Sequence, residues 1–211
     1  MTTIFLSHSK HDSNIIDIFR QSFAGTNVNP VLMEFEQFTN PPWLDIKRNI
    51  ENSRALFVLL SSNLKISDYT QNWVSYEIGI AVEANKQVWV FEDVNNQTIF
   101  PIPQVHHYMR YNPFQNESLN YLQTIVRSYG LNSQGALGLG LLSLLAFSNP
   151  AVAIAGAVIG SQINIPSQPT GSKIICPYQN CKVSFQYHNL DSNILCPSCR
   201  QPIEIQFQNN P

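Results

Sequence analysis

Charged side chains are scarce in this chain of 211 residues. They make up 12% of the sequence, about half the usual share, and Lys+Arg 12 against Asp+Glu 14 leaves a net charge of −2. Such a balance provides no basic surface for a nucleic-acid backbone, so we expect no nucleic-acid binding. Much of the deficit lies in one place, because no charged residue occurs between Arg127 and Lys173.

Other features are missing as well. The first residues, MTTIFLSHSKHD, have neither the basic flank nor the apolar core of a secretion signal. No glycine-rich phosphate-binding loop follows a strand, since Gly135, Gly138 and Gly140 fall within an apolar run. No cysteine precedes Cys176, and late cysteines without a secretion signal favour metal binding in a reducing compartment. We therefore expect a cytoplasmic protein.

Strand-like runs alternate with helical patterns in the first part of the chain. Strands and helices in alternation predict an α/β fold, with a parallel sheet covered by helices on both faces. The predicted strands are Thr3–Leu6, Val28–Phe35, Ala55–Leu60, Gln87–Phe91 and Tyr108–Tyr111, and the predicted helices are Ser13–Phe23, Trp43–Asn52, Asn72–Asn85 and Glu117–Tyr129.

Trp73 and Glu77 stand one helical turn apart in the run NWVSYEIGIA. Residues four positions apart are neighbours on a helix, so a ring and a carboxylate would project from one spot. The pair follows the apolar strand Ala55–Leu60, and ligands of α/β sheets bind beyond the carboxyl ends of the strands. Taken alone, the spacing favours a plainer interpretation, in which Trp73 packs in the core and Glu77 is a solvated charge.

A charge-free run, Gly135–Gly160, dominates residues 131–165. At about 26 residues it is long enough to cross a bilayer as one helix. Asn149-Pro150 in its middle favours two short helices joined by a turn, and Gly156-x-x-x-Gly160 permits close helix–helix approach. The alternatives are a membrane-associated or self-associating hairpin, one transmembrane span, and a buried hairpin that covers part of the first domain.

The cysteines form two pairs, Cys176/Cys181 and Cys196/Cys199, beyond a turn-rich linker at Pro166–Ser172. Each pair can present two sulfurs to one metal from a tight turn, and four thiolates in a tetrahedral array suit zinc. A module of this size has little core, so the metal would supply its folding energy. We predict a zinc ribbon over residues 173–208 with structural Zn²⁺, and two disulfides are the alternative.

Three motifs in sequence order resemble a TIR (Toll/interleukin-1 receptor) domain over residues 1–130. Ile4–Ser9 resembles the opening strand and Ser-His loop of that family, and Thr39–Trp43 lies where its long second loop stands. Ala55–Ser62 followed by Trp73–Glu77 resembles its third strand and W-x-x-x-E helix. The usual acidic residue before the first strand is replaced by threonine. The resemblance implies a flavodoxin-like, five-stranded parallel sheet and association into homo-oligomers.

The resemblance also implies a choice between two activities. Some TIR domains only associate, as adaptors, whereas others cleave NAD⁺ at the nicotinamide glycosidic bond with the W-x-x-x-E glutamate, here Glu77, as the catalytic residue. A carboxylate beside the ribose stabilises an oxocarbenium-like transition state. We expect an NAD⁺ hydrolase or ADP-ribosyl cyclase in immune or stress signalling, with an adaptor or a nucleoside-processing enzyme as alternatives. The implied nucleotide contacts are Phe5, Ser7, His8, Lys10, Trp43 and Trp73.

Overall fold

The computed structural model describes residues 2–9, 11–33, 42–61, 68–95, 98, 100–130, 169–189, 191 and 193–205. Lys10, most of the loop before Trp43 and the whole apolar run Gly135–Gly160 lie outside these residues, so the alternatives for that run stay open. Within the described ranges, no helix is both long and apolar enough to cross a membrane.

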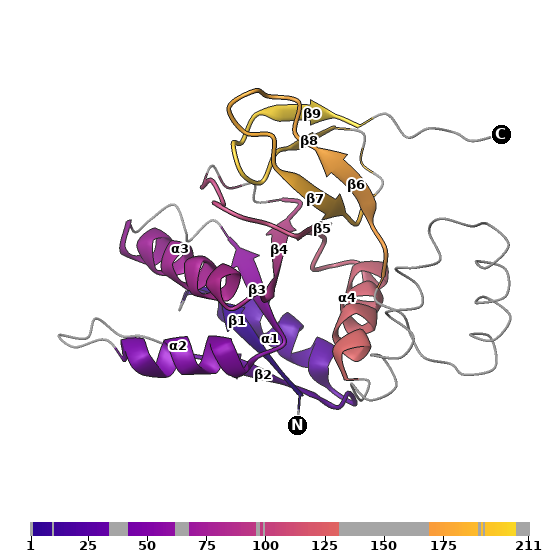
Figure 1. Cartoon of the computed structure of the whole chain (residues 1–211). Coiled ribbons are helices and arrows are strands. Elements are labelled where there is room, and N and C mark those ends of the chain that lie inside the picture. The colour runs from indigo at the N-terminus through magenta and orange to yellow at the C-terminus, as the bar shows by residue number, and fades with distance from the viewer. Residues whose placement is uncertain are drawn as a thin grey trace, which may run out of the picture.

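A mostly parallel sheet of seven strands forms the centre of the molecule (Figure 1). Its strand order is β2-β1-β3-β4-β5-β7-β6, and the first five strands have the flavodoxin-like order. The predicted α/β fold with a parallel sheet is therefore confirmed. The strands are β1 Thr2–Ser7, β2 Val28–Leu32, β3 Ala55–Leu60, β4 Gln87–Asp93, β5 His107–Tyr111, β6 Ser172–Ile175 and β7 Ser184–Tyr187, with β8 Asn193–Leu195 and β9 Pro202–Glu204 in a separate hairpin.

Within the described residues, four helices cover the two faces of this sheet. They are α1 Ser13–Phe23, α2 Trp43–Asn52, α3 Asp68–Glu83 and α4 Asn116–Tyr129. Every residue of β3 is buried, as expected for a central parallel strand with helices on both sides. Alternate β3 residues divide between two cores: Leu56 and its neighbours pack with α2 and α3, and Phe57 and its neighbours pack with α1 and α4. Helix pairs α2–α3 and α1–α4 therefore lie on opposite faces (Figure 1).

The C-terminal segment extends the sheet beyond the five strands expected from the sequence. Strand β7 lies parallel to β5, and the His188 N–H donates to the Tyr108 carbonyl at 3.0 Å. The ladder continues through a side chain, because the Arg110 N–H donates to Oδ1 of Asn189 at 2.7 Å and Nδ2 of Asn189 donates to the Arg110 carbonyl. Strand β6 then pairs antiparallel with β7 and forms the sheet edge. The cysteine-bearing segment is thus joined to the sheet by backbone pairing.

Two histidines link β5 and β7 on the α4 side. His107 Nδ1 and His188 Nε2 are 3.1 Å apart, and His188 Nδ1 lies 2.9 Å from the Tyr121 hydroxyl. The His107 ring stacks on Trp89 with a centroid separation of 4.0 Å. Burial lowers the pKa of His188 to about 4, and burial together with the neighbouring His188 and His106 lowers the pKa of His107 to about 3. Both rings are neutral near pH 7.

Acid should therefore loosen this junction. An unfolded histidine takes up its proton near the ordinary pKa of 6.5, whereas the folded pair resists until about pH 4 or below. The unfolded chain binds more protons in that window, so the free energy of unfolding falls as pH decreases from 6.5 towards 4. His188→Gln should reduce this slope in thermal unfolding. Equal slopes for His188→Gln and the wild type would contradict the interpretation.

Candidate functional site

The helix that carries Trp73 and Glu77 begins beyond the carboxyl end of β3 and packs against β3 and β4. Trp73 is 7% exposed and Glu77 is 5% exposed, so the tryptophan is in the core as the plainer interpretation holds. That interpretation is wrong for Glu77, because its carboxyl group is not a solvated charge. A buried carboxyl group that forms no ion pair with a described residue is costly, and such groups concentrate at functional sites.

Glu77 lies close to Ser7, the last residue of β1. Strands β1 and β3 are parallel neighbours in the sheet, so their carboxyl ends meet at one edge. The strand order reverses between these two strands, and ligands of flavodoxin-like folds bind in the crevice at that switch point. The fold therefore places Ser7 and Glu77 where this architecture binds its ligands.

Burial is the dominant influence on the Glu77 carboxyl group. It raises the pKa of Glu77 to about 7, since desolvation disfavours the charged form. The Ser7 hydroxyl, itself buried, partly opposes this shift through a weak contact that lacks ordinary hydrogen-bond geometry. Near neutral pH the group is thus present in both protonation states. It can stabilise a developing positive charge, or exchange a proton with a bound ligand.

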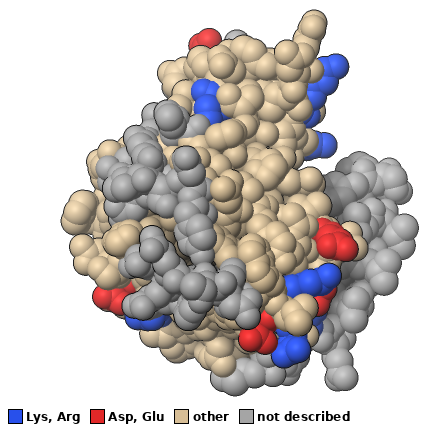
Figure 2. Space-filling view, turned by 90° about the vertical axis from the view of Figure 1, so that its left-hand side faces the viewer, with Lys and Arg blue, Asp and Glu red and all other residues tan. Residues whose placement is uncertain are grey.

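Three aromatic rings form a cluster beside Glu77. Trp43, the first residue of α2, stacks on Trp73 with centroids 4.3 Å apart and planes 23° apart. Tyr76 packs edge-on against both rings. Trp43 is 44% exposed and its neighbour Leu44 is 76% exposed, so the cluster continues from the buried site to the surface. Seen from the side of α2 and α3, charged side chains gather mainly along the lower part of the described surface (Figure 2).

The structure gathers some of the predicted nucleotide contacts and separates others. Ser7 adjoins Glu77, and Trp43 stacks on Trp73 one helical turn from Glu77. Phe5 is 1% exposed and belongs to the core under α2 and α3. The partly exposed His8 begins the loop after β1, where its Nδ1 lies 3.1 Å from the Ser9 carbonyl. Lys10 lies outside the described residues.

The four cysteines form the second candidate site. The Sγ atoms of Cys176 and Cys199 are 3.7 Å apart, those of Cys181 and Cys196 are 3.8 Å apart, and all four lie within 4.8 Å of one another. A tetrahedral zinc with bonds of about 2.3 Å requires sulfur separations of roughly 3.8 Å. The cysteines are unpaired by disulfides. Their arrangement therefore fits a metal ion such as zinc.

A buried ion pair that sequence reasoning missed joins this site to β4. Arg200, next to Cys199, lies 3.2 Å from Oε1 of Glu92, and the Glu92 side chain is completely buried. Glu92 also accepts hydrogen bonds from the Tyr108 hydroxyl and from the Thr98 N–H. The one signal in the sequence was an acidic residue near the end of the apolar strand QVWVFED.

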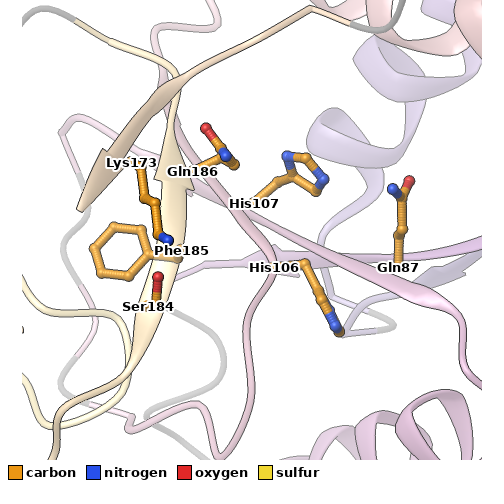
Figure 3. A pocket seen from close by; sticks show the side chains of 7 residues that line it. All are labelled: Gln87, His106, His107, Lys173, Ser184, Phe185 and Gln186. Atoms are coloured by element: carbon orange, nitrogen blue, oxygen red, sulfur yellow. The ribbon is translucent and has the colours of Figure 1, made fainter. Parts of the chain in front are cut away.

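A groove of about 360 Å³ is lined by neither Glu77 nor the cysteines (Figure 3). It is formed at the amino ends of β4 and β5, beside β6 and β7, whereas Ser7 lies at the carboxyl end of β1. Its position at the wrong end of the parallel strands argues against a role in chemistry at Glu77. The lining residues are Gln87, His106, His107, Lys173, Ser184, Phe185 and Gln186.

Comparison of the sequence with models of known protein families found no match, and a search of curated proteins likewise found none. The geometry of the two sites and the motifs in the sequence are therefore the basis for the function proposed below.

Proposed function

We propose that this chain is a TIR-type enzyme that cleaves the bond between nicotinamide and ribose in NAD⁺, with Glu77 as the catalytic residue. One observation carries the proposal: a buried carboxyl group with a pKa raised to about 7 lies at the β1–β3 switch point of a flavodoxin-like sheet. The family resemblance supplies the reaction class. A role in immune or stress signalling is part of the same proposal.

The chemistry requires little more than a well-placed negative charge. Nicotinamide leaves as a neutral molecule from a cationic ring, so no acid is needed to protonate it. The ionised Glu77 carboxylate stabilises the oxocarbenium-like ribose and accepts hydrogen bonds from its hydroxyl groups. Trp43 and Trp73 offer aromatic surface for a ring of the ligand. Water then captures the ribosyl cation to give ADP-ribose, or an atom of the same nucleotide captures it to give a cyclic product.

Incubating the purified protein with NAD⁺ and measuring free nicotinamide tests this proposal directly. Release of nicotinamide together with ADP-ribose or a cyclic nucleotide supports it. Activity on free deoxynucleosides or deoxynucleotides, with NAD⁺ left intact, would instead support a nucleoside-processing enzyme. Intact substrate in every reaction, over a range of protein concentrations, would exclude both enzymes.

The exposed aromatic cluster favours a second candidate, a non-catalytic TIR adaptor that acts by self-association. Large apolar side chains grouped on a protein surface are typical of protein contacts. In either function we propose a homo-oligomer and a cytoplasmic location, with residues 135–160 as an attachment to a membrane or to other copies.

Leu44→Asp should weaken self-association about tenfold or more, because it places a charge within the apolar surface. The side chain is 76% exposed and lies in the first turn of α2, where an acidic residue is tolerated, so folding should not suffer. Light scattering over a dilution series measures the change. Phe114→Ser, at an exposed residue in the β5–α4 connection, is the matched control. If Leu44→Asp associates as strongly as Phe114→Ser, the contact between copies does not involve Leu44.

We also propose that the four cysteines hold structural zinc, at about one ion per chain. Sulfur spacing that matches tetrahedral thiolate coordination supports this assignment. Metal analysis of protein purified under reducing conditions should find zinc, and Cys196→Ser should reduce the content. Two disulfides and no metal would contradict the proposal.

A further inference from the structure

The connection between β4 and β5 differs from the other parallel connections in the sheet. Parallel strands are ordinarily joined through a helix that covers one sheet face. The described residues of this connection, 94–95, 98 and 100–106, contain no helix. The face of β4 and β5 beside α3 therefore needs another cover.

The cysteine loops provide that cover together with Phe100, Ile102 and Val105 of the connection itself. Cys176 and Cys196 are buried in the same hydrophobic core as Val90 of β4 and Tyr108 of β5. The Pro197 carbonyl, one residue after Cys196, accepts a 2.9 Å hydrogen bond from the N–H of Ile102 in the connection. The predicted metal site is thus part of the core shared with α3. It occupies the position that a crossover helix would fill.

Arg200 connects this metal turn to the carboxyl end of β4. Its N–H donates to the Cys196 carbonyl at 2.9 Å, so the fold of the turn fixes its backbone. Its side chain is 8% exposed, and the guanidinium donates to the Phe100 carbonyl at 2.8 Å and pairs with Glu92. Glu92 alternates with Val88 and Val90 along β4 and so shares the sheet face covered by α3.

Loss of the metal would disorder the turn from Cys196 to Arg200 and so release the Arg200 backbone. The hairpin β8–β9 and the cysteine turns are short, and modules of this kind depend on their metal for order. A completely buried Glu92 without its cationic partner is strongly destabilising. The cost would fall on the end of β4, and β4 is one of the two strands that the helix with Glu77 packs against.

We propose that the metal centre replaces the missing crossover helix, and that metal occupancy, transmitted by Arg200, controls the order of β4 and of the adjoining Glu77 site. A metal chelator or a thiol oxidant that displaces the metal would thereby reduce the order of β4 and of the Glu77 site. The proposal rests on metal binding by the cysteines and is independent of NAD⁺ cleavage.

Hydrogen–deuterium exchange of the full chain tests this coupling. The metal is removed with a high-affinity zinc chelator, and zinc is then added back. Exchange in peptides covering β4 and β5 should accelerate about tenfold or more without metal and recover with zinc. Peptides from β2, at the far edge of the sheet, should change much less. Protein without metal as purified would overturn both the metal site and this inference. Bound metal whose removal leaves β4 exchange unchanged would overturn the inference alone.

Substitutions separate the role of Arg200 from that of the cysteines. Arg200→Gln should retain the metal but lower the unfolding temperature by about 10 °C, because it leaves Glu92 buried and unpaired. Replacing both Arg200 and Glu92 by methionine should recover only part of this loss, because the Tyr108 hydroxyl and the Thr98 N–H then lose their acceptor. Arg48→Gln, which breaks an exposed ion pair with Asp45, is the control and should change little. A single Arg200 variant as stable as the wild type, with normal β4 exchange, would overturn the assignment.

Discussion

Replacing Glu77 by glutamine should lower nicotinamide release from NAD⁺ by ~100-fold or more. Glutamine keeps the size of the side chain and one hydrogen-bond acceptor, but it cannot offset the positive charge of the oxocarbenium-like ribose. Free nicotinamide is the readout, measured at matched protein concentration. Glu83→Gln, at an exposed position on the same helix, should retain wild-type activity. A wild-type rate in the Glu77 variant would remove this residue from the mechanism.

The same residue should give the activity a pH dependence. The catalytic form is the ionised carboxylate, and burial raises the pKa of Glu77 to about 7. Activity of the wild type is therefore expected to rise with pH through about 7 and to level off above it. A rate that stayed constant from pH 5.5 to 8.5 would mean that another group, or a changed environment in the bound state, controls the reaction.

Glu77→Gln should also stabilise the fold at alkaline pH, by about 3 kcal/mol at pH 8. The folded carboxyl group titrates near pH 7 and the unfolded one near its ordinary value of 4.5. Between these values the folded state holds more protons, so the free energy of unfolding decreases as pH rises through the window. Below about pH 4.5 this penalty disappears, because both states are protonated. The native glutamate therefore lowers stability at neutral and alkaline pH, as expected of a residue kept for function.

Urea unfolding of wild type and variant at pH 4.5 and pH 8 measures the effect. The stability difference should be small at the lower pH and large at the higher pH. Because the comparison is between two proteins at one pH, the opposite influence of the buried histidines cancels. An inactive variant that is more stable than the wild type would show that its lost activity is not caused by unfolding. A difference that does not change with pH would contradict the burial of Glu77.

The local pattern of apolar residues was sufficient to predict most helices and strands of the first domain. Helices α1 and α2 and strand β3 begin and end at the predicted residues. Each has a strong local signal: Ser13–Phe23 has an apolar stripe at helical spacing, and Ala55–Leu60 is a continuous apolar run between polar residues. Helix α3 begins four residues before the predicted Asn72, at Asp68. Its first turn, Asp-Tyr-Thr-Gln, contains a single aromatic residue and so does not reveal the helical period.

Features that join distant parts of the chain were not predictable in this way. The pairing of β7 with β5 brings His188 beside Tyr108, and the ion pair brings Arg200 beside Glu92. Neither contact leaves a local periodicity, because each depends on the path of the chain between its partners. The burial of Glu77 is similar, since it depends on how α3 sits over the end of β1. The sequence motif points to Glu77 as a candidate residue. The pKa of its carboxyl group depends on burial, which the sequence does not reveal.

The order of synthesis gives the seventh and sixth strands a particular importance. Strand β5 leaves the ribosome well before Ser184–Tyr187, the strand that pairs with it. At about 5–20 residues per second, its outer edge waits roughly 4 to 15 s for that partner. An unpaired edge invites pairing with other chains, so nascent or truncated protein that ends after α4 exposes the β5 edge, which β7 covers in the full chain.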